Sequence, residues 1–281
     1  MTEPAVPIPT AGVAMTALGV ALIRVRETGR PDGLYTDPLA EAFLAAARPG
    51  FDDDRWSRME TLADQFYEGR TLAVKAVDDS VQEAVDAGCP QIVLLGAGLD
   101  TRAFRLPLPP GTLFFEVDLP ELFDFKEPVL AAHRARPVCT RRVVAADLAG
   151  DWERVLLTQG FRTDLPTAWI DEGVLGYLAR PDAYAVAEAV TRLSAPGSRF
   201  GIGRFEVDAA APRYSALREL VMADNASGRP VNGLGPEAET WFATHGWRTT
   251  FRAWDDLVAA YGRPATLGGD HAAGKVLAVR E

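Results

Sequence analysis

Short apolar runs separated by longer amphipathic segments recur along the 281-residue chain from residue 91 onward. The clearest is Ile92–Leu95, four consecutive apolar residues that predict a strand buried on both faces of a parallel sheet. Seven strands are predicted, at residues 91–95, 112–117, 141–145, 167–171, 198–204, 247–252 and 275–279. Helices are predicted at residues 11–29, 37–47, 56–67, 70–87, 120–134, 151–159 and 181–193. Because strands and helices mostly alternate, the pattern predicts a doubly wound α/β fold with a mostly parallel seven-stranded sheet, closed by an edge hairpin of the last two strands.

The order of these elements also predicts how the chain is organised. Residues 1–88 are expected to form a tail, a helical cap and an entry helix, and residues 89–281 the ligand-binding core. Within the core, residues 205–246 are expected to be a helical insertion on the substrate side. Residues 11–23 are apolar, but a membrane span needs about 18 apolar residues or more, so we expect a cap helix over the ligand site and no membrane association.

Composition and charge narrow the class of protein. A net charge of −10 argues against a nucleic-acid partner, whose phosphates require clustered basic residues. Four arginines that flank one predicted strand are expected to form a solvated rim: Arg134, Arg136, Arg141 and Arg142. Cys89 and Cys139 are read as packing residues in a reducing, cytoplasmic compartment, because no metal-ligand spacing surrounds them, and no secretory signal is recognised.

The first predicted strand of the core runs directly into a glycine-rich turn. Gly96-Ala97-Gly98 permits a tight turn with no Cβ in the way of a ligand. Twenty residues after Gly98, the next predicted strand ends in Asp118, the spacing at which an acid meets ribose hydroxyls in nucleotide-binding α/β sheets. The third glycine of the dinucleotide fingerprint is replaced by Thr101, which argues against NAD, FAD and a dehydrogenase.

Two further strands end in acidic residues. Asp147 and Leu148 follow the third strand, and Asp171-Glu172 end the fourth. Ligands of open α/β sheets bind outside the carboxyl ends of the strands, so these residues are expected to face one crevice with Gly96 and Asp118. The alternative role for Asp147 is as N-cap of the helix at 151–159.

Four motifs then carry a family resemblance. LGAGLDTRAFRL, EVD at Glu116–Asp118, ADL at Ala146–Leu148 and DEGVLGYL at Asp171–Leu178 occur in the order and spacing of class I S-adenosylmethionine (SAM)-dependent methyltransferases. They resemble most closely the leucine carboxyl methyltransferase-like branch, which includes many bacterial O-methyltransferases. The segment ALIRVRETGRPDGLYTDPLAEAF is similar to the cap that precedes the core in that branch.

The resemblance implies SAM as cofactor and a role for each strand end. Gly96, Ala97 and Gly98 would cradle the ligand, Asp118 would accept hydrogen bonds from the ribose, and Asp147 would accept one from the adenine amino group. Leu148 would supply a backbone N–H and an apolar wall, and Glu172 would bind the amino group of the methionyl part. The carboxylate of the methionyl part would pair with a basic residue before the first core strand. Arg70 is favoured for its planar fork, and Lys75 and Arg24 remain alternatives.

The acceptor and the catalytic residue stay open. A carboxylate acceptor needs no general base at neutral pH, whereas a hydroxyl would benefit from one. His133 is expected to be solvated or to cap a helix, His245 is interpreted as a C-terminal cap, and His271 is not assigned a role. The sequence therefore predicts O-methylation of a carboxylate on a small metabolite or peptide terminus, with no metal. The alternatives are methylation of a phenol or enol in secondary metabolism, and a SAM-binding protein without transfer activity.

Overall fold

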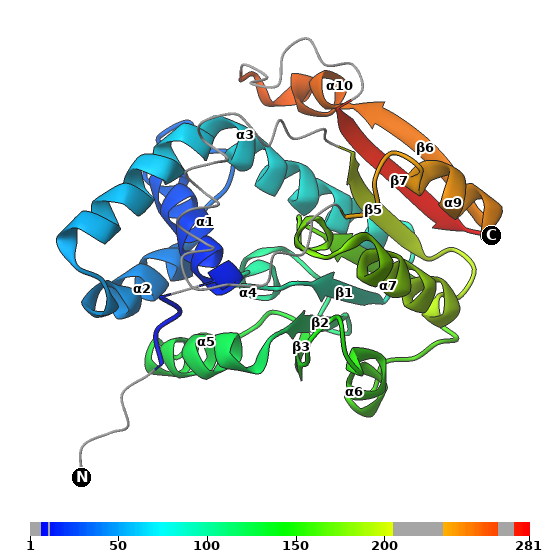
Figure 1. Ribbon diagram of the computed structural model, residues 1–281, viewed down its shortest axis with the longest axis horizontal. Helices are drawn as coiled ribbons and strands as arrows, with labels where there is room; N and C mark the ends of the chain where they lie inside the picture. Colours follow the sequence, from blue (N-terminus) through cyan, green and yellow to red (C-terminus); the bar gives the residue numbers. More distant parts are fainter. Residues whose placement is uncertain (1–6, 11, 205–232, 264–272) are drawn as a thin grey trace.

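The computed structural model describes residues 7–10, 12–204, 233–263 and 273–281, and its centre is one seven-stranded sheet (Figure 1). The strands lie in the order β3-β2-β1-β4-β5-β7-β6. β1 to β5 pair in parallel, and β7 runs opposite to both of its neighbours, β5 and β6. Their bounds are Gln91–Leu95 (β1), Leu113–Asp118 (β2), Thr140–Ala145 (β3), Thr167–Asp171 (β4), Arg199–Arg204 (β5), Trp247–Ala253 (β6) and Gly274–Arg280 (β7). The predicted fold class and the terminal antiparallel hairpin are confirmed.

Helices cover both faces of the sheet, and β1 shows why. Val93 and Leu95 point to one face, where they share a core with residues of α6 (Trp152–Thr158), α7 (Arg180–Leu193) and α9 (Ala238–Thr244). Ile92 and Leu94 point to the other, where they meet α3 (Asp53–Asp86) and α4 (Arg102–Arg105). Successive side chains of a strand alternate between faces, so this continuous apolar run serves two cores.

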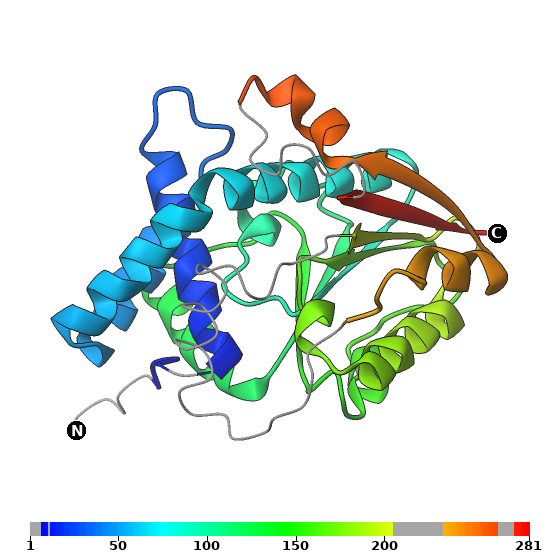
Figure 2. The same cartoon turned by 45° about the horizontal axis from the view of Figure 1, so that its top comes forward.

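The N-terminal helices form a third core beside the sheet. α1 (Gly12–Thr28) packs against α2 (Pro38–Ala47) and α3, and apolar side chains of α5 (Pro120–Ala132) complete the cluster. Figure 2 shows α1, in blue, beside the long cyan α3. The remaining short elements are the 3-10 turns at Arg48–Gly50, Leu175–Tyr177 and Ala259–Tyr261, and α10 (Trp254–Val258). Among the described helices, none combines the length and apolarity that a membrane span needs.

The prediction of two helices at 56–67 and 70–87 is wrong, because α3 is continuous over 34 residues. Glu68 and Gly69 lie within it as regular helical residues. A glycine in a helix interior costs about 1 kcal/mol relative to alanine. Buried residues on both sides of Gly69, from Tyr67 to Leu72, contribute packing that offsets this cost. Of the predicted insertion, residues 205–232 lie outside the described residues, and α9 falls in the remainder.

The prediction of a solvated rim is wrong for Arg141, although Arg134, Arg136 and Arg142 are exposed. The Arg141 side chain is only 9% exposed and donates to Glu116 Oε1 and Oε2 at 2.9 and 2.7 Å. Glu116 lies on the neighbouring β2 and is fully buried with Lys126 of α5, whose ammonium is 2.7 Å away. A buried carboxylate needs such partners, so Arg141 turns inward. Cys89 and Cys139 are buried and free, as expected of packing residues.

Candidate functional site

The glycine turn after β1 is packed too tightly for any side chain at its first position. Gly96 has φ +66°, in the left-handed region that favours glycine. A Cβ built on Gly96 would lie 2.4 Å from Cβ of Val174, which follows β4. Gly98 has φ +49°, and a Cβ there would lie 3.4 Å from Ala17 of α1. The turn thus lies against the loop after β4 and against α1, the helix expected to form the cap.

Asp118 ends β2 beside this turn and is held by two backbone donors. Its Oδ2 accepts from Gly98 N at 2.6 Å, and its Oδ1 accepts from Leu119 N at 2.7 Å. Burial raises the pKa of Asp118, while the two backbone hydrogen bonds oppose that rise. Each carboxylate oxygen keeps a further lone pair, so Asp118 can accept two more hydrogen bonds without moving.

Asp147 and Leu148 follow β3, and the backbone ties them to Asp118. Ala146 N donates to Asp118 O at 2.8 Å, which places the two strand ends side by side. The Asp147 side chain is exposed, and its Oδ1 accepts from Ala149 N at 2.9 Å. The N-cap position of α6 is occupied by Asp151, so Asp147 does not cap that helix. Leu148 is 8% exposed and belongs to the core on the α6 face.

Asp171 and Glu172 lie at the end of β4 and make different contacts. Asp171 Oδ1 accepts from Gly173 N and Leu175 N, at 3.0 and 3.2 Å, and so shapes the loop that presses Val174 onto Gly96. Burial raises the pKa of Asp171, and these backbone donors act against the shift. Glu172 is 13% exposed, and its Oε1 is buried without a hydrogen-bond partner in the described structure. A buried carboxylate oxygen of this kind is suited to a cation.

Of the two basic residues that the sequence offers on α3, Arg70 and not Lys75 lies beside Glu172. Arg70 Nη1 lies 3.4 Å from Glu172 O and 3.9 Å from Glu172 Oε1, and its side chain is 35% exposed. Lys75 instead pairs with Asp79 and lies over the ring of Tyr261, 5.3 Å from its centroid. Five residues correspond to about 500° around a helix, so the two side chains leave α3 in different directions.

The third basic candidate, Arg24 on α1, joins the cap to the turn after β1. Its Nη1 donates to Leu99 O at 3.0 Å, and its guanidinium lies 3.6 Å from Asp100 and 3.8 Å from Asp37. Asp37 in turn accepts from Thr101 Oγ1 at 2.7 Å. Thr101, which replaces the third fingerprint glycine, therefore links the cap to the turn by a hydrogen bond. The helix that follows Thr101 has only four residues.

The sequence interpretation missed Arg102, the most connected side chain of this region. Arg102 is fully buried and donates to Asp78 Oδ1 at 2.7 Å, to Glu172 Oε2 at 2.6 Å and to Asp100 Oδ2. Although burial acts to raise it, the charges of Arg102 and Arg24 hold the pKa of Asp100 at about 2. The available signal was the Asp-Thr-Arg order directly after the glycine turn, which places an arginine within reach of an acid at a predicted ligand site.

The two described histidines serve as helix ends, as interpreted from the sequence. His245 follows α9, its Nδ1 lies 2.6 Å from Trp241 O, and its ring stacks on Trp241 with centroids 3.9 Å apart. His133 is the exposed C-cap residue of α5. His271 lies outside the described residues.

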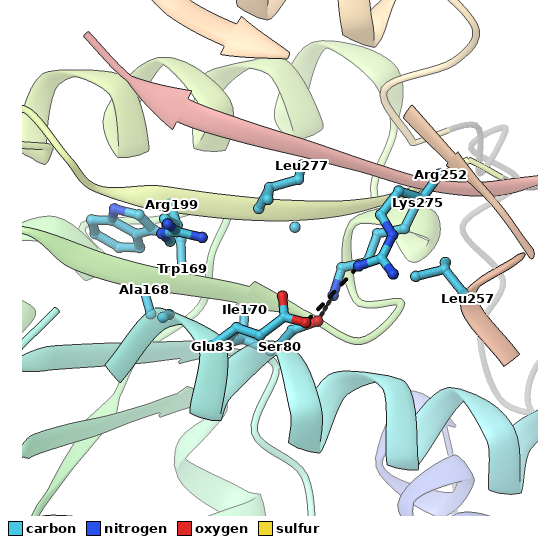
Figure 3. Close-up of a pocket in the computed structure, with 12 residues that line it drawn as sticks. Ser80, Glu83, Ala168, Trp169, Ile170, Arg199, Arg252, Leu257, Lys275 and Leu277 are labelled. Carbon is cyan, nitrogen blue, oxygen red and sulfur yellow. Dashed lines mark hydrogen bonds and ion pairs between the residues drawn. The ribbon is translucent and has the colours of Figure 1, made fainter. Parts of the chain in front are cut away.

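A small cavity lies between α3 and the sheet, lined by residues of β4, β5 and β7 (Figure 3). Its volume of about 30 Å³ suits a water molecule and is too small for a nucleoside. Lys275 of β7 reaches into it and donates to Ser80 Oγ at 2.8 Å, beside Arg252 and Glu83 (Figure 3). Burial, together with the charge of Arg102, lowers the pKa of Lys275 to about 8. The residues at the strand ends, and not those of this cavity, form the candidate functional site.

Gly96→Ala is expected to destabilise the chain far more than Gly262→Ala. Both glycines have φ +66°, so each alanine incurs a left-handed backbone cost of about 1 to 2 kcal/mol. Only at Gly96 would the new Cβ also meet Val174, whereas no described atom lies within 4 Å of that point at Gly262. We expect the unfolding free energy of Gly96→Ala to fall by about 3 kcal/mol or more, measured by urea titration. Equal losses in the two variants would contradict the steric argument.

Lys275→Met is expected to stabilise the chain at neutral pH. Below pH 8 the lysine is charged in both the folded and unfolded states, and only the folded state carries the cost of burying the charge. Between the folded pKa of about 8 and the ordinary value of 10.5, the unfolded state binds more protons, so wild-type stability rises with pH. We expect Lys275→Met to be more stable by an amount of order 2 kcal/mol at pH 7, with the difference shrinking towards pH 10 in denaturant titrations. A difference independent of pH would refute the buried-charge assignment.

Comparison with known proteins gives the family. A family model described as leucine carboxyl methyltransferase matches residues 17–191, more than half of the chain. A relative from Parafrankia sp. (strain EAN1pec) is 42% identical over 242 residues, which cover 85% of this chain and 78% of that protein. One from Streptomyces coelicolor is 37% identical over 273 residues, covering 92% of each. Both are assigned by name as S-adenosyl-L-methionine-dependent methyltransferases.

The fold comparison agrees. A crystal structure of a methyltransferase from Thermobifida fusca YX superimposes with a TM-score of 0.58 at 20% identity and covers 100% of this chain and 98% of its own. At that identity the match shows the shared fold alone. Together with the family model and the relatives, it establishes that the chain belongs to the leucine carboxyl methyltransferase family and is a SAM-dependent methyltransferase.

Proposed function

We propose that this enzyme transfers the methyl group of SAM to a carboxylate oxygen of a small metabolite or a peptide terminus. The observation that carries the proposal is that the titratable groups near the candidate site are engaged in contacts with the backbone. Asp118 and Asp171 accept hydrogen bonds from backbone N–H groups, and His245 caps α9. The two acids hold the site in shape, neither described histidine lies at the carboxyl ends of the strands, and an acceptor that is already ionised requires no proton removal. The family described as leucine carboxyl methyltransferases supports the same acceptor class.

The residues at the strand ends fit the amino-acid part of SAM. Oε1 of Glu172, which has no hydrogen bond, would accept from the α-ammonium, and the partly exposed guanidinium of Arg70 would bind the α-carboxylate. The two side chains approach within 3.9 Å, so one ligand that carries an ammonium next to a carboxylate could contact both. Arg70 is preferred over Lys75 because Lys75 is taken up by Asp79.

The nucleoside part would lie along β1, β2 and β3. Gly96, Ala97 and Gly98 would contact it through their backbone, because Val174 and Ala17 occupy the space beside the two glycines. Asp118 would accept from both ribose hydroxyls with the lone pairs that Gly98 N and Leu119 N leave free. Asp147 would accept from the adenine amino group, with the Leu148 N–H as donor to the ring. These assignments agree with the general position of ligands in open α/β sheets.

Methyl transfer then depends mainly on position. When bound, SAM supplies a methyl carbon on a sulfonium, which an acceptor oxygen can attack in line with the breaking bond. Holding the oxygen about 3 Å from that carbon is the main contribution that a protein can make. The contacts of Arg70, Glu172 and Asp118 would fix both ends of the cofactor, and the cap would keep water from the reacting atoms.

Asp118→Ala is expected to weaken binding of S-adenosylhomocysteine, the demethylated product of SAM. Loss of a charged acceptor for two hydroxyls costs about 1.5 to 3 kcal/mol in binding free energy. Asp124→Ala, at an exposed position on nearby α5, is the control and should leave affinity unchanged. The measurement is calorimetric titration of both variants. An unchanged dissociation constant in Asp118→Ala would remove Asp118 from the site.

The acceptor class can be decided from the rate and the product. With a carboxylate acceptor, the rate of the chemical step should be nearly flat from about pH 6 to 9, because the nucleophile is ionised throughout. The labelled product should release methanol in mild alkali, as methyl esters do. A rate that rises with pH, together with a product stable to alkali, would indicate a phenol or enol acceptor instead. Host extract incubated with isotopically labelled SAM provides the substrate pool for both measurements.

A further inference from the structure

The position of Glu172 depends on a side chain that has no access to the ligand. Glu172 Oε2 accepts from Arg102 Nη1 at 2.6 Å, and Arg102 is 0% exposed. Its Nε donates to Asp78 Oδ1 on α3 at 2.7 Å, and its Nη2 donates to Val74 O at 3.2 Å. Asp100, in the turn after β1, accepts from both the guanidinium and the backbone N–H of Arg102. One planar group therefore joins α3, the glycine turn and the end of β4.

This network leaves one oxygen of Glu172 for a ligand. Arg102 occupies Oε2, and Oε1 is buried with no hydrogen bond in the described structure. A free glutamate side chain could rotate either oxygen toward solvent or toward Arg70. The hydrogen bond from a guanidinium that is itself fixed by Asp78 and Asp100 removes that freedom, so Oε1 has a defined direction before a ligand arrives.

The charges of the network balance only when Arg70 is counted with them. Three carboxylates, on Asp78, Asp100 and Glu172, face two guanidinium groups, on Arg102 and Arg105. Arg24, 3.6 Å from Asp100, is matched by Asp37 at 3.8 Å. Arg70 is the third cation, but it lies 3.9 Å from Glu172 Oε1, beyond hydrogen-bond distance, and its side chain is 35% exposed. A ligand that carries an ammonium next to a carboxylate would give Glu172 and Arg70 a hydrogen-bonded partner each.

We infer that Arg102 is a positioning residue for methyl transfer: it orients Glu172 so that Oε1 receives the α-ammonium of the cofactor. The inference rests on the proposed role of Glu172. Arg102 does not touch the cofactor and acts only through the carboxylate. Its effect should therefore appear in the recognition of the amino-acid part of the ligand and not in that of the nucleoside.

Two ligands separate these parts. S-adenosylhomocysteine carries the amino-acid part, and 5′-methylthioadenosine has the same nucleoside and a thioether without it. In Arg102→Lys the charge stays in the buried network, but one ammonium cannot reproduce a planar fork that bridges three acids. We expect the dissociation constant of S-adenosylhomocysteine to rise about tenfold or more, and that of 5′-methylthioadenosine to change less than about twofold.

Arg263→Lys is the matched control. Arg263 is also largely buried and donates to both oxygens of a buried carboxylate, Glu27, at 3.1 and 2.9 Å, but no contact joins it to the described residues of the Arg102 network. The ratio of the two affinities should be unchanged in this variant. If Arg102→Lys weakens both ligands equally, as a general loss of structure would, the positioning role is wrong. Asp78→Asn, which keeps Arg102 and removes the charge that anchors its Nε, repeats the test if Arg102→Lys does not fold.

Glu172→Gln separates this inference from the proposal on which it rests. If Glu172→Gln leaves S-adenosylhomocysteine affinity unchanged, Glu172 is not the ammonium ligand, and both fail. If Glu172→Gln weakens binding and Arg102→Lys does not, only the role of Arg102 fails. With both correct, Arg102→Lys should add little in the Glu172→Gln background, because the two changes remove the same interaction. Additive losses would overturn the inference.

Discussion

The burial of the Arg102 guanidinium is the constraint on which the candidate site depends. A charge at 0% exposure is tolerable only when acceptors surround it, and Asp78, Asp100 and Glu172 are drawn to it from three different elements. Through these contacts the long helix α3, the glycine turn and the end of β4 hold one another. The site is therefore a product of packing between elements, not of any one loop.

The same arrangement explains why the cap belongs to the core. Arg24 of α1 reaches Leu99 O and approaches Asp100, and Thr101 donates to Asp37 at the start of α2. These are buried polar contacts between residues that lie 64 to 76 positions apart in the chain. Apolar packing of α1 and α2 against α3 and α5 adds a large shared surface. The N-terminal helices are thus tied to the turn that would carry the cofactor.

Much of this could be predicted from local sequence, and the exceptions share a cause. Apolar runs such as Ile92–Leu95 and the turn at Gly96–Gly98 are defined by neighbouring residues, and the predicted strands match the structure to within one residue at either end. Gly69 within α3, Arg141 turned inward and Arg102 at the centre of the site each depend on partners distant in the sequence. Periodicity and spacing do not record which buried carboxylate a cation will meet. Tertiary packing decides it.

The buried carboxylate of Glu116 has a consequence for the edge of the sheet. Along β3 only Val144 is fully buried, so hydrophobic patterning gives this strand little preference for one alignment over another. Arg141 supplies that preference, because a shift of one residue would turn it to the opposite face and leave Glu116 with Lys126 alone. Misaligned pairing of the strand is thereby penalised electrostatically. Asp147 lies just beyond the last residue of β3, so its position depends on the ion pair between Arg141 and Glu116 at the other end of that strand.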